Sequence, residues 1–125
     1  MKVAVVGSRE FKDKEFVKRK LKYAAWNWSD EDGFQKNILV SGGAKGVDSW
    51  AEEWWREDHH GESNIQIFKP NWDVHGNRAG AIRNQQIVDA ADYIVAFWDG
   101  KSKGTKITID MALKAGKPLD LYVRN

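Results

Sequence analysis

The stretch LVSGGAKGVD at residues 39–48 decides the fold, because an apolar strand-like run enters a glycine-rich turn and then a helix-like pattern. Glycines allow tight turns and close backbone approach, and the first N–H groups of a helix lack intrahelical partners. Such a turn is typical of an anion pocket, although a plain strand-to-helix turn is the alternative. A second turn of this kind, DGKSKGT, occupies residues 99–105. Together the two turns predict a ligand that carries phosphate.

Five apolar runs alternate with helical patterns, and this alternation predicts a parallel sheet with helices on both faces. The runs cover residues 3–6, 38–40, 65–68, 93–97 and 119–123. The first, second and fourth are continuously apolar, as strands buried on both faces must be, whereas the third and fifth alternate as edge strands do. We therefore predict a doubly wound α/β fold of five parallel strands in the order 3-2-1-4-5.

Four helices are predicted between these strands. Asp13 caps the first, which reaches about residue 28 with Val17, Leu21, Ala24 and Trp28 on one face. The second runs from residue 46 to about 59, and a weaker one from about 80 to 90. The last carries Thr108, Met111, Ala112 and Ala115 on one face and ends at Gly116.

Composition narrows the class of protein. The 125 residues form one domain, 1–125, and 42% hydrophobic with 30% charged residues is ordinary for a globular protein. A net charge of +2 does not by itself argue for nucleic-acid binding. The absence of cysteine excludes disulfides and thiol catalysis. The apolar N-terminal run is too short for a signal peptide or a membrane span, so we expect a cytoplasmic protein with no membrane partner.

The strand order also predicts where a ligand binds. In doubly wound sheets, ligands occupy the crevice outside the carboxyl ends of the strands, where the order reverses between strands one and four. The loops at that point are Gly7-Ser8-Arg9 and residues 100–105, with residues 42–48 beside them. All the glycine-rich loops are therefore predicted to converge on one crevice.

Four motifs in this order resemble the SLOG superfamily, which joins the Smf/DprA DNA-processing proteins to the Lonely-guy nucleotide hydrolases. They are VGSR at residues 6–9, VSGGAKGVD at 40–48, GAIRN at 80–84 and Gly104-Thr105. The chain is most similar to the YspA-like branch, in which a segment like NWD at residues 71–73 precedes an Ala-Gly-x-Ile-Arg-Asn motif. This resemblance spans residues 3 to about 118 and implies a Rossmann-like domain that binds nucleotides or nucleotide-derived ligands.

The predicted ligand-binding residues come from all of these loops: Gly7, Ser8, Arg9, Gly42, Gly43, Lys45, Gly46, Asp48, Arg83, Asn84, Gly104 and Thr105. Arg83 is expected to open a helix, where a cation opposes the macrodipole unless an anion lies beside it. Asp48 complements the start of its own helix, and contact with a ribose hydroxyl is the alternative. Lys45, Lys101 and Lys103 either meet the ligand or are ordinary solvated charges.

The resemblance to Lonely-guy proteins also raises the question of catalysis. Their Pro-Gly-Gly-x-Gly-Thr-x-x-Glu turn ends in a catalytic glutamate, and alignment with Gly104-Thr105 places Thr108 at that position. A hydroxyl cannot replace this carboxylate. Binding of a nucleotide-derived small molecule is therefore the first expectation. Ribosyl hydrolysis with Asp48, Asp73 or Asp99 supplying a carboxylate is the second, and single-stranded DNA binding of Smf/DprA type is the third.

The aromatic and histidine residues complete the predictions. Trp50, Trp54 and Trp55 share one helical face, which indicates either core packing or self-association. We predict that part of this face, or of the edge strands, is buried in a homo-oligomer. Trp72 and Trp98 fall in loops at the ligand end, where one of them either stacks on a base or packs structurally. The histidines lack metal-ligand spacing, so no metal site and no cofactor are predicted.

Overall fold

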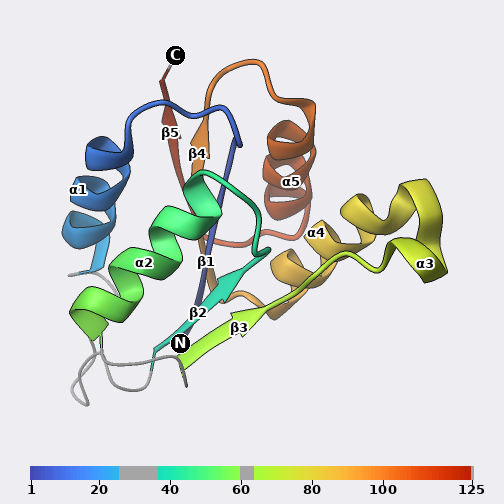
Figure 1. The fold of residues 1–125 in the computed structure, drawn as a ribbon, viewed down its shortest axis with the longest axis horizontal. Helices are drawn as coiled ribbons and strands as arrows, with labels where there is room; N and C mark the ends of the chain where they lie inside the picture. Colours follow the sequence, from blue (N-terminus) through green and yellow to red (C-terminus); the bar gives the residue numbers. More distant parts are fainter. Residues whose placement is uncertain (26–36, 60–63, 125) are drawn as a thin grey trace.

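The computed structural model describes residues 1–25, 37–59 and 64–124, and it contains a five-stranded, entirely parallel sheet (Figure 1). The strand order is β3-β2-β1-β4-β5, which confirms the order predicted from strand composition. The strands are β1 (Lys2–Gly7), β2 (Ile38–Ser41), β3 (Ile65–Ile67), β4 (Tyr93–Trp98) and β5 (Leu119–Val123). The fold is therefore the predicted Rossmann-like α/β arrangement.

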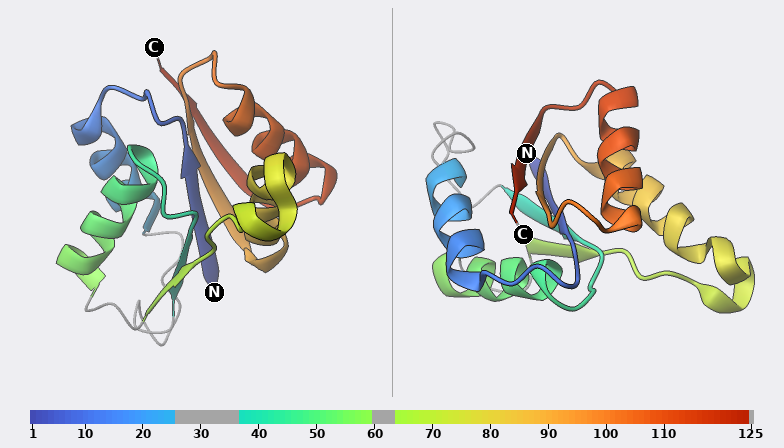
Figure 2. Two further views of the ribbon diagram at one scale, coloured as in Figure 1. Left: turned by 45° about the vertical axis from the view of Figure 1, so that its right-hand side comes forward. Right: turned by 90° about the horizontal axis from the view of Figure 1, so that it is seen from above.

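Helices cover both faces of the sheet (Figure 2). On one face, α1 (Lys14–Ala24) and α2 (Val47–His59) pack on Val3, Val5 and other side chains of the central strands. On the opposite face, α4 (Ala79–Ala90) and α5 (Lys103–Lys114) pack on Ala4, Val6 and their neighbours. The alternation of side chains along β1 thus supplies both cores, which explains why every residue from 3 to 6 is apolar and buried.

The first helix begins as predicted. The Oδ1 atom of Asp13 accepts a hydrogen bond from the N–H of Phe16, and Val17, Leu21 and Ala24 are buried on the face that meets the sheet. The predicted continuation of this helix to residue 28 lies outside the described residues. At the other end of the chain, Gly116 has a φ of +69° just beyond α5, as the predicted helix stop requires.

One residue of α5 does not lie where the pattern predicted. Thr108 and Ala112 are buried and Met111 is partly buried, but Ala115 is exposed. The helix ends at Lys114 and Ala115 forms its cap, so the chain is already turning away from the sheet at this position.

The tryptophans of α2 belong to the core of this chain. Trp54 is 3% exposed and Trp55 is 0% exposed, and their ring centroids are 6.1 Å apart in an edge-to-face arrangement. Trp50 is partly buried against the same cluster. Core packing is therefore the correct alternative, and none of the side chains of this helix whose burial is described is an exposed large apolar group. Self-association through the edge strands stays a prediction.

A short helical arm before α4 is absent from the sequence prediction. It consists of α3 (Trp72–His75) and a 3₁₀ turn, η4 (Gly76–Arg78), neither of which contains a buried residue. Figure 2 shows the arm projecting beyond the body of the domain. Because α4 begins at Ala79, Arg83 lies in the second turn, and the expectation that it opens the helix is wrong. Among the described helices, none has the length and apolar character needed to span a membrane.

Candidate ligand-binding site

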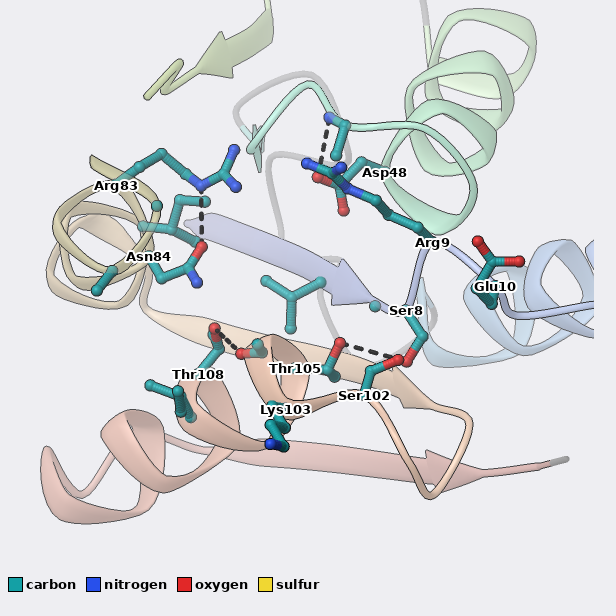
Figure 3. Close-up of a pocket in the computed structure, with 18 of the residues that line it drawn as sticks. Ser8, Arg9, Glu10, Asp48, Arg83, Asn84, Ser102, Lys103, Thr105 and Thr108 are labelled. Carbon is teal, nitrogen blue, oxygen red and sulfur yellow. Dashed lines mark hydrogen bonds between the residues drawn. The ribbon is translucent and has the colours of Figure 1, made fainter. Parts of the chain in front are cut away.

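A cavity of about 550 Å³ lies at the carboxyl ends of β1, β2 and β4, as the strand order predicted (Figure 3). Its volume falls in the range of small-molecule sites. The residues around it come from the loops after these strands and from α3, α4 and α5. They are Val6, Gly7, Ser8, Arg9, Glu10, Ala44, Asp48, Trp72, Gly80, Ala81, Arg83, Asn84, Ile87, Ser102, Lys103, Gly104, Thr105, Ile107 and Thr108.

Most of the residues predicted from the sequence meet in this cavity. Those that line it are Gly7, Ser8, Arg9, Asp48, Arg83, Asn84, Gly104 and Thr105. Gly42, Gly43, Lys45 and Gly46 lie in the adjacent turn but do not line the cavity. The two glycine-rich turns are therefore not equivalent.

Two N–H groups of the turn at residues 42–48 donate hydrogen bonds to nearby side chains. The N–H of Gly43 donates to Oγ of Ser41, and the N–H of Ala44 donates to Oδ2 of Asp48, each at 3.2 Å. Gly43 and Gly46 have positive φ values of 68° and 79°, a conformation that favours glycine whether or not a ligand is present. These glycines thus shape the turn, and Lys45 is an exposed charge outside the cavity.

Two arginines and one carboxylate form the first polar region of the cavity. Nη1 of Arg83 donates to the carbonyl oxygen of Gly42 at 2.7 Å. Its Nε donates to Oδ1 of Asn84 at 2.9 Å (Figure 3). Burial lowers the pKa of Arg83; the charge of Asp48 raises it, and that of Arg9 lowers it further. Two guanidinium groups thus interact with one buried carboxylate and leave an excess of positive charge.

Asp48 is a buried residue, 6% exposed. Burial raises the pKa of Asp48 to about 6, although the N–H of Ala44 and the charges of Arg83 and Arg9 act in the opposite direction. This carboxyl can therefore exchange a proton near neutral pH, which distinguishes it from an ordinary surface aspartate.

Hydroxyl groups and the start of α5 form the second polar region. Oγ of Ser8 and Oγ1 of Thr105 are hydrogen-bonded at 3.3 Å, and both residues are buried. The hydroxyl of Ser102 makes no helix-capping bond and instead donates to Asp99. The N–H groups of the first turn of α5 thus receive no cap from Ser102 and lie beside the cavity, an arrangement that suits an anion.

The three carboxylates considered as substitutes for the catalytic glutamate lie in different surroundings. Oδ1 of Asp99 accepts hydrogen bonds from the N–H groups of Lys101 and Ser102. Partial burial opposes ionisation, but these hydrogen bonds lower the pKa of Asp99 to about 2. Asp99 therefore stabilises its own turn, and Asp73 lies exposed on α3. Neither residue lines the cavity. Asp48 does.

Sequence reasoning missed Glu10, which also lines the cavity. Its position directly after Ser8-Arg9 was the available signal. His75, considered as an orienting group together with Asp73, is likewise exposed and outside the lining. Trp98, the other candidate for base stacking, donates its Nε1 proton to the carbonyl oxygen of Ser102 and packs against the core. Trp72 lines the cavity.

Solved structures with low sequence identity share this fold. DNA processing protein A from Helicobacter pylori superposes with a TM-score of 0.69 and 21% identity, over 97% of this chain and 64% of that one. The structure of TM1055 gives a TM-score of 0.61 and 23% identity, over 94% of this chain and 71% of that one. The chain thus spans less than two thirds of the Helicobacter protein, and these likenesses establish the fold alone.

Sequence comparisons go further. The family model described as "YspA, cpYpsA-related SLOG family" matches residues 1–75. Gene 61 protein of Mycobacterium phage D29 is 32% identical over 124 residues, which cover 94% of this chain and 93% of that protein. The resemblance drawn from the four motifs is confirmed: the chain belongs to the YspA, cpYpsA-related SLOG family.

Proposed function

We propose that the protein binds a nucleotide or a nucleotide-derived small molecule in this cavity. One observation carries the proposal: a single cavity of about 550 Å³ is lined by the first turn of α5, the hydroxyls of Ser8 and Thr105, and two arginines. Helix N-termini and guanidinium groups are the donors that proteins use for phosphate. The hydroxyls and Asn84 offer hydrogen bonds of the kind that a sugar needs.

The balance of charge in the cavity supports an anionic ligand. Arg9, Arg83 and Lys103 face Glu10 and Asp48, so cations exceed anions by one when both carboxyls are ionised. Each charge-assisted hydrogen bond to an anion contributes about 1.5–3 kcal/mol. Loss of one arginine should therefore weaken binding by about tenfold or more.

The test begins with native mass spectrometry of gently purified protein, in which a copurifying nucleotide would identify the ligand class. Calorimetric titration with nucleoside monophosphates then compares Arg83→Ala and Arg9→Ala with the unmodified protein. Lys45→Ala is the matched control, because this exposed cation lies near the cavity without lining it. Affinities that are unchanged in both arginine variants would place the ligand elsewhere. Circular dichroism checks that Arg83→Ala, which loses the bond to Gly42, remains folded.

Ribosyl hydrolysis is a second candidate function, and Asp48 is the observation that favours it. A buried carboxyl whose pKa is raised to about 6 suits general acid–base chemistry near neutral pH. Against this, Thr108 occupies the position of the Lonely-guy glutamate, and its hydroxyl donates to the carbonyl oxygen of Gly104. Chromatographic detection of free base decides the matter. Turnover by the unmodified protein that is lost in Asp48→Asn would replace the binding proposal with hydrolysis.

Single-stranded DNA is the third candidate ligand. The similar Helicobacter pylori protein is described as having a unique single-stranded DNA binding mode. The same cations would serve a strand of phosphates, and affinity would then fall steeply with salt concentration. An oligonucleotide that displaces a bound mononucleotide, with this salt dependence, would favour the nucleic acid over the small molecule.

A further inference from the structure

We infer that Trp72 stacks on a planar aromatic base, so that the ligand class of this cavity is a base-bearing nucleotide rather than a sugar phosphate. The inference rests on the proposed function and deepens it. It assigns the base to the exposed part of the cavity at Trp72 and the phosphate to the start of α5.

The position of Trp72 has no explanation in the packing of the domain. Trp72 is the first residue of α3, a helix with no buried residue, and its side chain is 55% exposed. A large aromatic ring usually stabilises a protein by being buried, and an exposed ring does not make this contribution. Trp72 nevertheless lines the cavity. A ligand that covers the ring would supply the missing burial.

The edge of the ring lies against the first turn of α4, at the wall of the cavity. Gly80, in the first turn of α4, also lines the cavity, and a Cβ atom placed on it would lie 3.7 Å from Cη2 of Trp72. The ring edge therefore lies close to a helix surface that carries no side chain. Ile107 of α5 lines the same cavity and is 47% exposed, which adds a second apolar wall.

Exposure divides the cavity into two parts. Ser8 and Thr105 are 1% and 8% exposed, whereas Trp72 and Ile107 are about half exposed. The hydroxyl donors thus lie in the buried part beside the apolar Val6 and Ile87, whereas the outer part combines Trp72 and Ile107 with the exposed cations Arg9 and Lys103. A base that covers Trp72 would therefore lie in the outer part of the cavity, because a base presents a flat face for stacking.

The side chains of the other described tryptophans pack within the domain. Trp98 is held by its bond to Ser102 and packs on the core, and Trp54 and Trp55 are buried on the opposite face of the sheet. Of the tryptophans in the described part of the chain, Trp72 is the one that combines exposure with a place in the cavity lining.

Calorimetric titration of four proteins with two kinds of ligand tests the inference. The ligands are the nucleoside monophosphates AMP, GMP, CMP and UMP, and ribose 5-phosphate, which has the same sugar and phosphate without a base. The proteins are the unmodified chain, Trp72→Ala, Trp72→Phe and, as matched control, Val74→Ala. Val74 lies on the same arm and is 70% exposed but does not line the cavity. Because α3 has no buried residue, each variant should fold normally.

We expect Trp72→Ala to lose roughly 5- to 150-fold in affinity for the best-bound monophosphate, the range of base–aromatic stacking. Its affinity for ribose 5-phosphate should not change. Trp72→Phe should retain most of the affinity, and Val74→Ala all of it. Selective loss of the base-bearing ligand supports the inference, because a merely structural role for Trp72 would weaken both ligands together.

Two results would overturn the inference while leaving the proposed function intact. The first is tight binding of a monophosphate that Trp72→Ala does not alter. The second is an equal loss of monophosphate and ribose 5-phosphate in that variant. If the unmodified protein binds none of the four monophosphates and no nucleotide-derived compound copurifies with it, the proposed function itself is wrong, and the inference falls with it.

Discussion

Replacing Gly104 by alanine should change stability and ligand affinity in opposite directions. The variant therefore distinguishes a glycine that the fold requires from one that a ligand requires. Gly104 is the second residue of α5 and lines the cavity. Its φ is not positive, and a Cβ atom placed there would meet no other atom within 4 Å. Glycine is a poor helix residue, so the folded chain would be more stable with alanine at this position. The glycine is explained if a ligand comes close to this part of the backbone.

The size of both effects can be worked out from the structure. Alanine in a helix is favoured over glycine by about 0.5–1 kcal/mol. For a domain of 125 residues this corresponds to a Tm about 2–4 °C higher. The affinity for the ligand should fall, because a methyl group would stand between the helix N–H groups and the phosphate. Loss of one charge-assisted bond lowers affinity about tenfold or more.

Gly116→Ala provides the matched control at the other end of the same helix. Gly116 has a φ of +69°, which strains any residue with a side chain, and it is not part of the cavity lining. This variant should therefore lose about 1 kcal/mol of stability and keep its affinity for the ligand. The two alanine variants should thus change stability in opposite directions, and only Gly104→Ala should weaken binding.

Differential scanning calorimetry gives the two Tm values, and titration with the best-bound monophosphate gives the affinities. A higher Tm for Gly104→Ala together with undiminished affinity would refute the close approach of the ligand to α5. A lower Tm would show instead that the fold itself requires this glycine.

Three further predictions concern the core, the turn and the carboxyl beside the arginines. Trp55 is 0% exposed, so Trp55→Ala should cost about 3–5 kcal/mol in urea denaturation; a cost below 1 kcal/mol would contradict its place in the core. A Cβ atom on Gly46 would lie 2.8 Å from the carbonyl oxygen of Arg9, and φ is +79°, so Gly46→Ala should lower Tm even without ligand. Burial raises the pKa of Asp48 from 3.8 to about 6, so the folded chain binds this proton more tightly than the unfolded chain does. The contribution of the Asp48 proton to the unfolding free energy is therefore lost as pH rises from about 4 to 7. Asp48→Asn lacks this proton, so across that interval its unfolding free energy should fall by about 3 kcal/mol less than that of the unmodified protein.

Local patterns in the sequence were enough to predict the strands, their order and the helices that cover the sheet, but not the arm of α3 and η4. Continuous apolar runs mark strands buried on both faces, and alternating runs mark edges, because a strand shows its two sides in turn. Asp13 and Gly116 mark helix ends, because a side-chain acceptor and a positive φ are needed within a few residues of those ends. These signals are short-range and can be read without knowing the fold.

The composition of the site was also largely predictable, because the carboxyl ends of parallel strands meet at one edge of the sheet. What each residue does there was not. Two glycine-rich turns look alike in sequence and both bond nearby side chains, yet the glycines at 42, 43 and 46 lie outside the cavity lining while Gly104 lies in it. The spacing of residues within a turn does not say which acceptor its N–H groups will meet.

Contacts between distant segments were decided only by the tertiary structure. Ser8 meets Thr105 from 97 residues away, and Arg83 reaches the carbonyl of Gly42 from 41 residues away. The role of Trp72 likewise depends on where the arm of α3 leaves the body of the domain. Secondary structure follows from neighbours in the chain, whereas side-chain partners follow from how the packed elements face one another. The sequence alone therefore determined the fold and eight of the residues that line the cavity, and packing determined which groups lie open to that cavity.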